Sequence, residues 1–240
     1  VLTVDDHPLI RSALREVVGM MTGRVELLEA ANPPEGLEVL KRRPDTDLVF
    51  LDLSFGQHDG LAFVQSFRTA APAGWPVAVH AIGDLPNREA PDAFEETRAD
   101  WAPLGLRNRI EHAQLLAPED LGRFADLGVA ASVQFSHATS DRDVADRYWA
   151  GKTDGAYAFR SLLDSGAVVA NGSDAPIEEL DPLAGIRAGV LRTIDERPAW
   201  HPEQTLTVEQ AFQATCVTPA WLSYDEGLQQ LGSPEEVTPS

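Results

Sequence analysis

Residues 77–84 read Val-Ala-Val-His-Ala-Ile-Gly-Asp, a short apolar run that is interrupted by a histidine. The run predicts a strand at 77–79, and the spacing of apolar residues behind it predicts a helix at 90–97. The same order continues along the chain, with strands predicted at 108–110, 129–133 and 168–170. Strands that alternate with helices favour a parallel sheet with right-handed crossovers.

The pattern also extends toward the N-terminus. Strands are predicted at 1–4, 25–30 and 48–51, and Pro8 and Pro33 suit the first turns of the helices that follow the first two. The chain thus has about seven strands, one fewer than a closed eight-stranded barrel. We expect an α/β fold in one continuous domain, either an open doubly wound sheet or a barrel-like closure. An unclosed sheet edge would favour a homodimer.

The composition disfavours two classes of partner. Lys and Arg total 19 against 38 Asp and Glu, so the net charge is −19. This charge disfavours binding to nucleic acid and to anionic membrane surfaces. The single cysteine, Cys216, excludes an internal disulfide framework. No signal peptide or membrane-spanning stretch is evident, and we therefore expect a cytoplasmic location.

Three carboxylates follow the predicted N-terminal strands. Asp5 and Asp6 come after the first strand, and Asp52 ends the third. The carboxyl ends of parallel strands meet at one edge of a sheet, so these side chains would gather there and repel one another. Oxygen ligands of this kind suit Mg²⁺, and the residues therefore predict a magnesium site. The alternative is that they are surface acids without a function.

Residues 1–70 resemble the receiver domain of response regulators. The resemblance rests on Val1-Leu-Thr-Val-Asp-Asp-His-Pro and Leu48-Val-Phe-Leu-Asp-Leu-Ser. It implies a flavodoxin-like part with strand 1 between strands 2 and 3, Asp52 as phosphoacceptor, and Asp5 and Asp6 at the Mg²⁺ positions. A receiver also carries a lysine at the end of its fifth strand, where this chain has Glu111 and His112.

A second set of candidate ligands lies at the ends of later strands. His80, His112 and Asp174 each follow a predicted strand, and in a parallel barrel such residues converge on the mouth. Imidazole nitrogens and a carboxylate suit Zn²⁺ or Mn²⁺. His137 comes after the strand at 129–133, where it could contact a substrate or could be a loop histidine that caps backbone groups.

From about residue 74 to residue 226 the chain resembles the amidohydrolase superfamily, near its N-substituted formamide deformylase branch. The motifs are Val79-His-Ala-Ile-Gly-Asp, Arg109-Ile-Glu-His-Ala-Gln, Ala131-Ser-Val-Gln and Gly172-Ser-Asp-Ala-Pro. The resemblance implies that His80 and His112 are metal ligands from barrel strands five and six. It also implies that Asp174, from strand eight, is a ligand or the catalytic base. The family's His-x-His pair is absent from this sequence.

Together these features predict a chimera of a receiver fragment, residues 1–70, and a TIM-barrel-like amidohydrolase half, residues 71–230. Because each part lacks essential partners, we expect a designed or recombined scaffold that keeps a partial divalent-metal site without efficient activity. Asp5, Asp6 and Asp52 could then share one rim with the histidines as a hybrid metal site. The alternatives are a metal-dependent hydrolase of C–N bonds in small amides and a phosphoacceptor module.

Overall fold

The structure is a computed structural model that describes residues 1–5, 8–20, 25–43, 45–46, 49–51, 64 and 67–225. The chain divides into two compact units. The first comprises Val1–Trp75 and Glu96–Leu106, and the second comprises Pro76–Glu95 and Arg107–Ser240. The chain therefore returns to the first unit at residues 96–106. A single boundary near residue 70, as expected from the sequence, does not describe this return. That boundary, like the single continuous domain and the homodimer, stays a prediction.

The first unit contains a parallel sheet of three strands, in the order β2-β1-β3. Leu2 of the central strand is in register with Leu28 on one side and Val49 on the other. This order is the one expected from the receiver resemblance, while the flavodoxin-like classification stays a prediction. The strands are β1 (Leu2–Val4), β2 (Leu28–Ala30) and β3 (Val49–Leu51).

Two helices follow the first two strands of this unit, α1 (Pro8–Met20) and α2 (Pro33–Arg42). The side chain of Asn32 accepts a hydrogen bond from the backbone N–H of Glu35 and caps α2. A Cβ atom at Gly36 would lie 2.8 Å from the Val4 side chain, so the glycine lets α2 pack closely on β1. The described residues of the unit also include η1 (Ala71–Ala73), α5 (Arg98–Trp101) and η2 (Ala102–Leu104).

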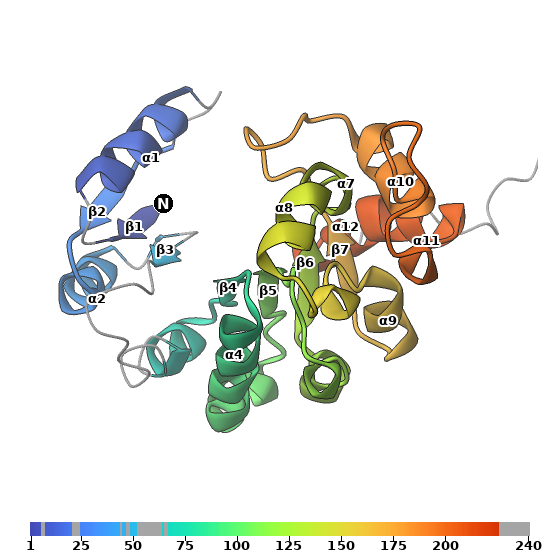
Figure 1. The fold of residues 1–240 in the computed structure, drawn as a ribbon. Coiled ribbons are helices and arrows are strands. Elements are labelled where there is room, and N and C mark those ends of the chain that lie inside the picture. Colours follow the sequence, from blue (N-terminus) through green and yellow to red (C-terminus); the bar gives the residue numbers. More distant parts are fainter. Residues whose placement is uncertain are drawn as a thin grey trace, which may run out of the picture. The chain divides into compact units, whose positions relative to one another are not determined.

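The second unit is built on a parallel sheet of four strands in sequential order, β4-β5-β6-β7. Figure 1 shows these strands beside one another, with α9 next to β7. Val79, Ile110 and Val133 are buried in the core of this unit. The strands are β4 (Ala78–Ala81), β5 (Arg109–His112), β6 (Ala130–Val133) and β7 (Val169–Asn171). The total of seven strands over the described residues confirms the predicted number, while closure of the sheet into a barrel stays a prediction.

The helices described in the second unit lie between these strands in the chain or after the last of them. Among the described residues after β7, the last helix is α12, whose neighbour η6 is a π-helical turn. The elements are α4 (Asp84–Glu96), η3 (Pro118–Asp120), α6 (Arg123–Leu127), α7 (His137–Ser140), α8 (Arg142–Tyr148), η4 (Thr153–Gly155), α9 (Phe159–Asp164), α10 (Pro182–Leu191), η5 (Pro202–Gln204), α11 (Val208–Phe212), η6 (Gln213–Val217) and α12 (Thr218–Leu222).

The polar segment 134–154, which lacks the apolar periodicity of a helix, nevertheless contains α7, α8 and the start of η4. Distant residues hold these short helices in place. The Trp200 indole donates to Asp146 at 3.0 Å, and the Tyr157 hydroxyl donates to Asp141 at 2.9 Å. Tertiary contacts of this kind override local composition.

Among the described residues, no helix is both long enough and apolar enough to cross a lipid bilayer.

Candidate metal centre

Two of the candidate ligands lie where the backbone leaves its strand. His112 is the last residue of β5 and has a φ of 73°, and Asp174, three residues after β7, has a φ of 56°. Residues other than glycine adopt this left-handed region rarely, and their strain tends to concentrate at functional sites. The backbone at the ends of β5 and β7 thus marks this edge of the sheet as a candidate site.

A cluster of three potential ligands forms at this edge. One ligand atom each from His112, His137 and Asp174 lies within 4.8 Å of the others. His137 Nε2 is 3.9 Å from Asp174 Oδ2, and the rings of His112 and His137 are nearly parallel at 16°. Both histidines are buried, whereas the Asp174 side chain keeps 33% of its surface exposed. Imidazole nitrogens and a carboxylate gathered in one place are donors that fit Zn²⁺ or a similar divalent ion.

His80 lies directly beside this cluster. Its Nδ1 atom is 2.9 Å from Nε2 of His112, which places two of the expected ligands in contact. The His80 residue is exposed, but the protein atoms around its ring remove part of its hydration, and this desolvation lowers its pKa. The neighbouring His112 lowers the pKa further. A low pKa favours the neutral imidazole, the form that binds metal.

Two glutamines contact the cluster and were not anticipated from the sequence. Gln134 Oε1 lies 2.9 Å from His112 Nδ1, and Gln114 Nε2 lies 3.1 Å from His137 Nδ1. Both glutamines are buried and end the motifs at 109–114 and 131–134. Gln114 comes two residues after His112, and Gln134 directly follows β6. These positions could have identified them from the sequence, since residues around metal ligands commonly fix the imidazole orientation.

His137 carries an unsatisfied polar atom. Its Nε2 is buried and has no hydrogen-bond partner among the described residues. Buried polar groups in native proteins are nearly always paired, so an unpaired nitrogen beside Asp174 indicates a place where a bound molecule or ion could contact it. His137 is the first residue of the short helix α7, and both functions expected for it stay predictions.

The N-terminal candidates belong to the first unit. Asp5 follows β1 directly and is 6% exposed, with its backbone N–H donating to the carbonyl oxygen of Ala30. Asp6 and Asp52 lie outside the described residues. The magnesium site, the phosphoacceptor role and the hybrid site with the histidines therefore stay predictions.

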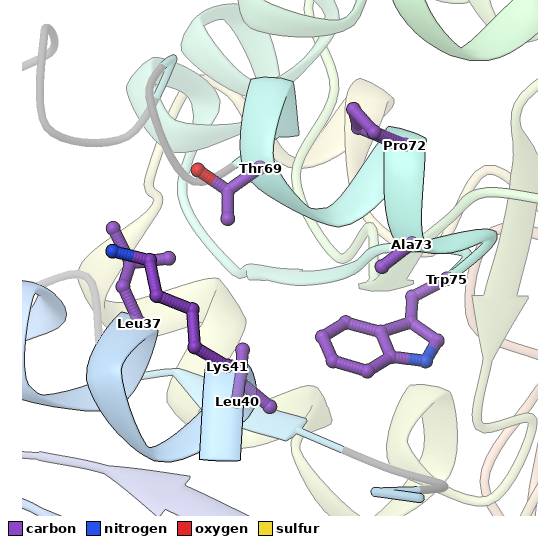
Figure 2. A pocket seen from close by; sticks show the side chains of 7 residues that line it. All are labelled: Leu37, Leu40, Lys41, Thr69, Pro72, Ala73 and Trp75. Atoms are coloured by element: carbon purple, nitrogen blue, oxygen red, sulfur yellow. The ribbon is translucent and has the colours of Figure 1, made fainter. Parts of the chain in front are cut away.

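A separate pocket of about 390 Å³ lies within the first unit. Apolar side chains of α2 and of the segment around η1 line most of it, and Lys41 supplies its one cationic group. Figure 2 shows the ring of Trp75 turned toward Leu40 and Lys41 on α2. None of its lining residues belongs to the histidine cluster, so this pocket does not serve the candidate metal centre.

Comparison with known proteins points to one family. The model of the amidohydrolase family matches residues 36–235, more than half of the chain. Protein LONG AFTER FAR-RED 3 of Arabidopsis thaliana is 37% identical over 161 residues, 65% of this chain and 28% of that protein. Putative amidohydrolase YtcJ of Bacillus subtilis (strain 168) is 34% identical over 173 residues, 70% of this chain and 32% of that protein.

The fold agrees with this match. An uncharacterized metal-dependent hydrolase from Pyrococcus furiosus superposes with a TM-score of 0.64 and 24% identity, covering 94% of this chain and 52% of that one. The chain thus spans about a third of the length of these curated relatives and about half of the solved structure. The mixed α/β fold with parallel sheets is consistent with an amidohydrolase barrel.

Similarity to response regulators is weaker and partial. The nitrate/nitrite response regulator protein NarL of Escherichia coli (strain K12) is 26% identical over 151 residues, 60% of this chain and 67% of that protein. This similarity does not establish a chimeric, designed or recombined origin, or an inactive scaffold. The family match instead favours the alternative of a metal-dependent hydrolase. Since the family model covers most of the sequence, including the histidine cluster, the chain belongs to the amidohydrolase family.

Proposed function

We propose that this protein hydrolyses C–N bonds of small amides in a reaction that depends on a divalent metal ion. The observation that carries the proposal is the cluster of His112, His137 and Asp174, with its buried and unpaired His137 Nε2. The motifs at residues 79–84 and 109–114 resemble those of N-substituted formamide deformylases, and a small N-substituted amide is therefore the substrate class to test first. The family match and the resemblance of the fold to metal-dependent hydrolases support the same reaction class.

The residues of the cluster would bind the metal ion, and Asp174 would also transfer a proton. His112, with His80 2.9 Å away, would hold the ion together with Asp174. A metal ion held there would lower the pKa of a water molecule and polarise the substrate carbonyl. Asp174, which is partly exposed, would take a proton from the attacking water and return it to the leaving amine.

The experiment measures turnover of a panel of N-substituted formamides and acetamides by the protein after metal removal and reloading with Zn²⁺ or Mn²⁺. We expect amine release that appears on reloading, stops with chelator and is lost in Asp174→Asn. His201→Ala is the matched control, because His201 forms its hydrogen bond with Glu203 rather than with the cluster. Release that is independent of metal, or equal in wild type and Asp174→Asn, would contradict the proposal.

A further inference from the structure

We propose that Gln134 and Gln114 give the two stacked histidines opposite tautomers and thereby opposite functions. His112 becomes a metal ligand, whereas His137 becomes a hydrogen-bond donor to the carbonyl oxygen of the substrate. The inference rests on the proposed function and adds two positioning residues, Gln114 and Gln134, and a specific function for His137.

The tautomer of His112 follows from its contact with Gln134. The amide oxygen Oε1 of Gln134 can only accept a hydrogen bond, so Nδ1 of His112 must carry the proton. A neutral imidazole with a proton on Nδ1 has its lone pair on Nε2. This Nε2 faces His80 Nδ1 at 2.9 Å and therefore accepts a hydrogen bond there when no metal is bound. The same lone pair is the one that a metal ion would use.

The tautomer of His137 is the reverse. The amide nitrogen Nε2 of Gln114 can only donate, so Nδ1 of His137 must accept, and its single proton lies on Nε2. This N–H is the buried group without a hydrogen-bond partner among the described residues. Asp174 Oδ2, at 3.9 Å, is beyond hydrogen-bond distance. A protonated nitrogen has no lone pair for a metal, so His137 is set up to donate rather than to ligate.

His80 differs from His137 in its freedom to change tautomer. His80 is exposed, so its outer nitrogen can exchange a proton with solvent and release the lone pair of Nδ1 toward the metal. His137 is 4% exposed and is held by Gln114, so the same change would break a buried hydrogen bond. The third protein ligand is therefore His80, beside His112 and Asp174.

The unpaired N–H of His137 acquires a function from this arrangement. When water attacks an amide carbonyl, negative charge develops on the carbonyl oxygen, and a buried donor that is already oriented stabilises that charge. The oxygen would also satisfy the orphaned Nε2–H. No proton transfer is required of His137, since the water gives its proton to Asp174.

The first test is direct observation of the tautomers. We expect long-range ¹H–¹⁵N spectra of the metal-free, ¹⁵N-histidine-labelled protein to show the proton on Nδ1 of His112 and on Nε2 of His137. Addition of Zn²⁺ should shift Nε2 of His112 and leave the nitrogens of His137 protonated as before. A proton on Nδ1 of His137, or a Zn²⁺ shift of its Nε2, would overturn the inference, because the Gln114 amide would then present its oxygen to the ring.

The second test compares variants by calorimetric Zn²⁺ titration and by kinetics. His112→Ala should weaken Zn²⁺ binding by about 100-fold or more, whereas His137→Ala should change it by no more than about threefold and lower kcat with little effect on KM. Gln114→Glu, which can only accept a hydrogen bond, should move the proton of His137 to Nδ1 and bring Nε2 into contact with Zn²⁺.

Gln204→Glu is the control for placing a carboxylate in a buried position, because Gln204 is 6% exposed and bonds to Ser161. It should leave both histidine tautomers unchanged. Equal loss of Zn²⁺ binding in His137→Ala and His112→Ala would overturn the inference and leave the hydrolase proposal standing. Wild-type protein without turnover would instead count against the proposed function, and the spectra would still decide the tautomers.

Discussion

Nδ1 of His80 lies 2.9 Å from Nε2 of His112, although the sheet register pairs His80 with Glu111 and pairs His112 with Ala81. Paired residues share a face of the sheet, and successive residues along a strand point to opposite faces. Regular strand geometry would therefore place the rings of His80 and His112 on opposite faces. The φ of 73° at His112 takes its backbone out of the strand, and the ring then meets that of His80. The contact is thus a product of the strained strand end.

Affinity for Zn²⁺ should depend on His80 but not on His201, which lies outside the cluster. We expect His80→Ala to weaken Zn²⁺ binding by at least about tenfold, because it removes a nitrogen that lies beside His112 Nε2. Equilibrium dialysis with Zn²⁺ measures the effect. His201→Ala, whose side chain pairs with Glu203, should bind Zn²⁺ as the wild type does. Unchanged affinity in His80→Ala would exclude His80 from the ligand set.

Gly155 lies against the backbone of a neighbouring segment, and a side chain there should destabilise the protein. A Cβ atom at this position would be 1.9 Å from the carbonyl oxygen of Leu116. We expect Gly155→Ala to lower the free energy of unfolding by about 2–4 kcal/mol, since backbone must move to accommodate it. Urea denaturation provides the measurement. Gly122→Ala, with open space around its Cβ, should change stability by less than about 1 kcal/mol.

The hydroxyl of Tyr157 should make the protein sensitive to alkali. Burial, and then the neighbouring Asp141, raise the pKa of Tyr157 above its ordinary value of 10.0. The stabilisation is complete below pH 10 and is lost as pH rises further, because the unfolded tyrosine ionises first. Urea titrations from pH 8 to pH 11 should therefore show a smaller alkaline loss of stability in Tyr157→Phe than in wild type.

The exposed Tyr148 supplies the comparison for that experiment, since it is 70% exposed. Tyr148→Phe should lose stability with rising pH in parallel with the wild type. Parallel curves for Tyr157→Phe and wild type would show that ionisation of Tyr157 is not linked to folding.

Arg192 should contribute strongly to the stability of the second unit. It is fully buried, donates to the carbonyl oxygens of Trp200 at 3.0 Å and Tyr157 at 3.2 Å, and has its pKa lowered by burial to about 10. We expect Arg192→Ala to cost about 3 kcal/mol, because it leaves a cavity and two buried acceptors without donors. Thermal unfolding followed by circular dichroism measures it, and Arg187→Ala, on the exposed side of α10, should be nearly neutral.

Much of the fold could be predicted from the sequence because burial of apolar strands leaves a local signal. The seven predicted strands are present, with boundaries that differ by a few residues, and the segments around Ile110 and Val133 form core strands as expected. The helices of segment 134–154 could not be predicted in the same way. Their polar residues are held by partners far along the chain, such as Trp200 for Asp146.

The sequence by itself determined the parallel βα order and the identity of His80, His112 and Asp174 as candidate ligands, because residue type and position after a strand are local properties. Only the tertiary structure brought His137 to Asp174 and placed Gln114 and Gln134 on the histidine rings. These contacts join residues 22 to 37 positions apart, and they depend on where each strand ends and how its backbone turns. Such geometry is set by packing of the whole unit rather than by any single motif.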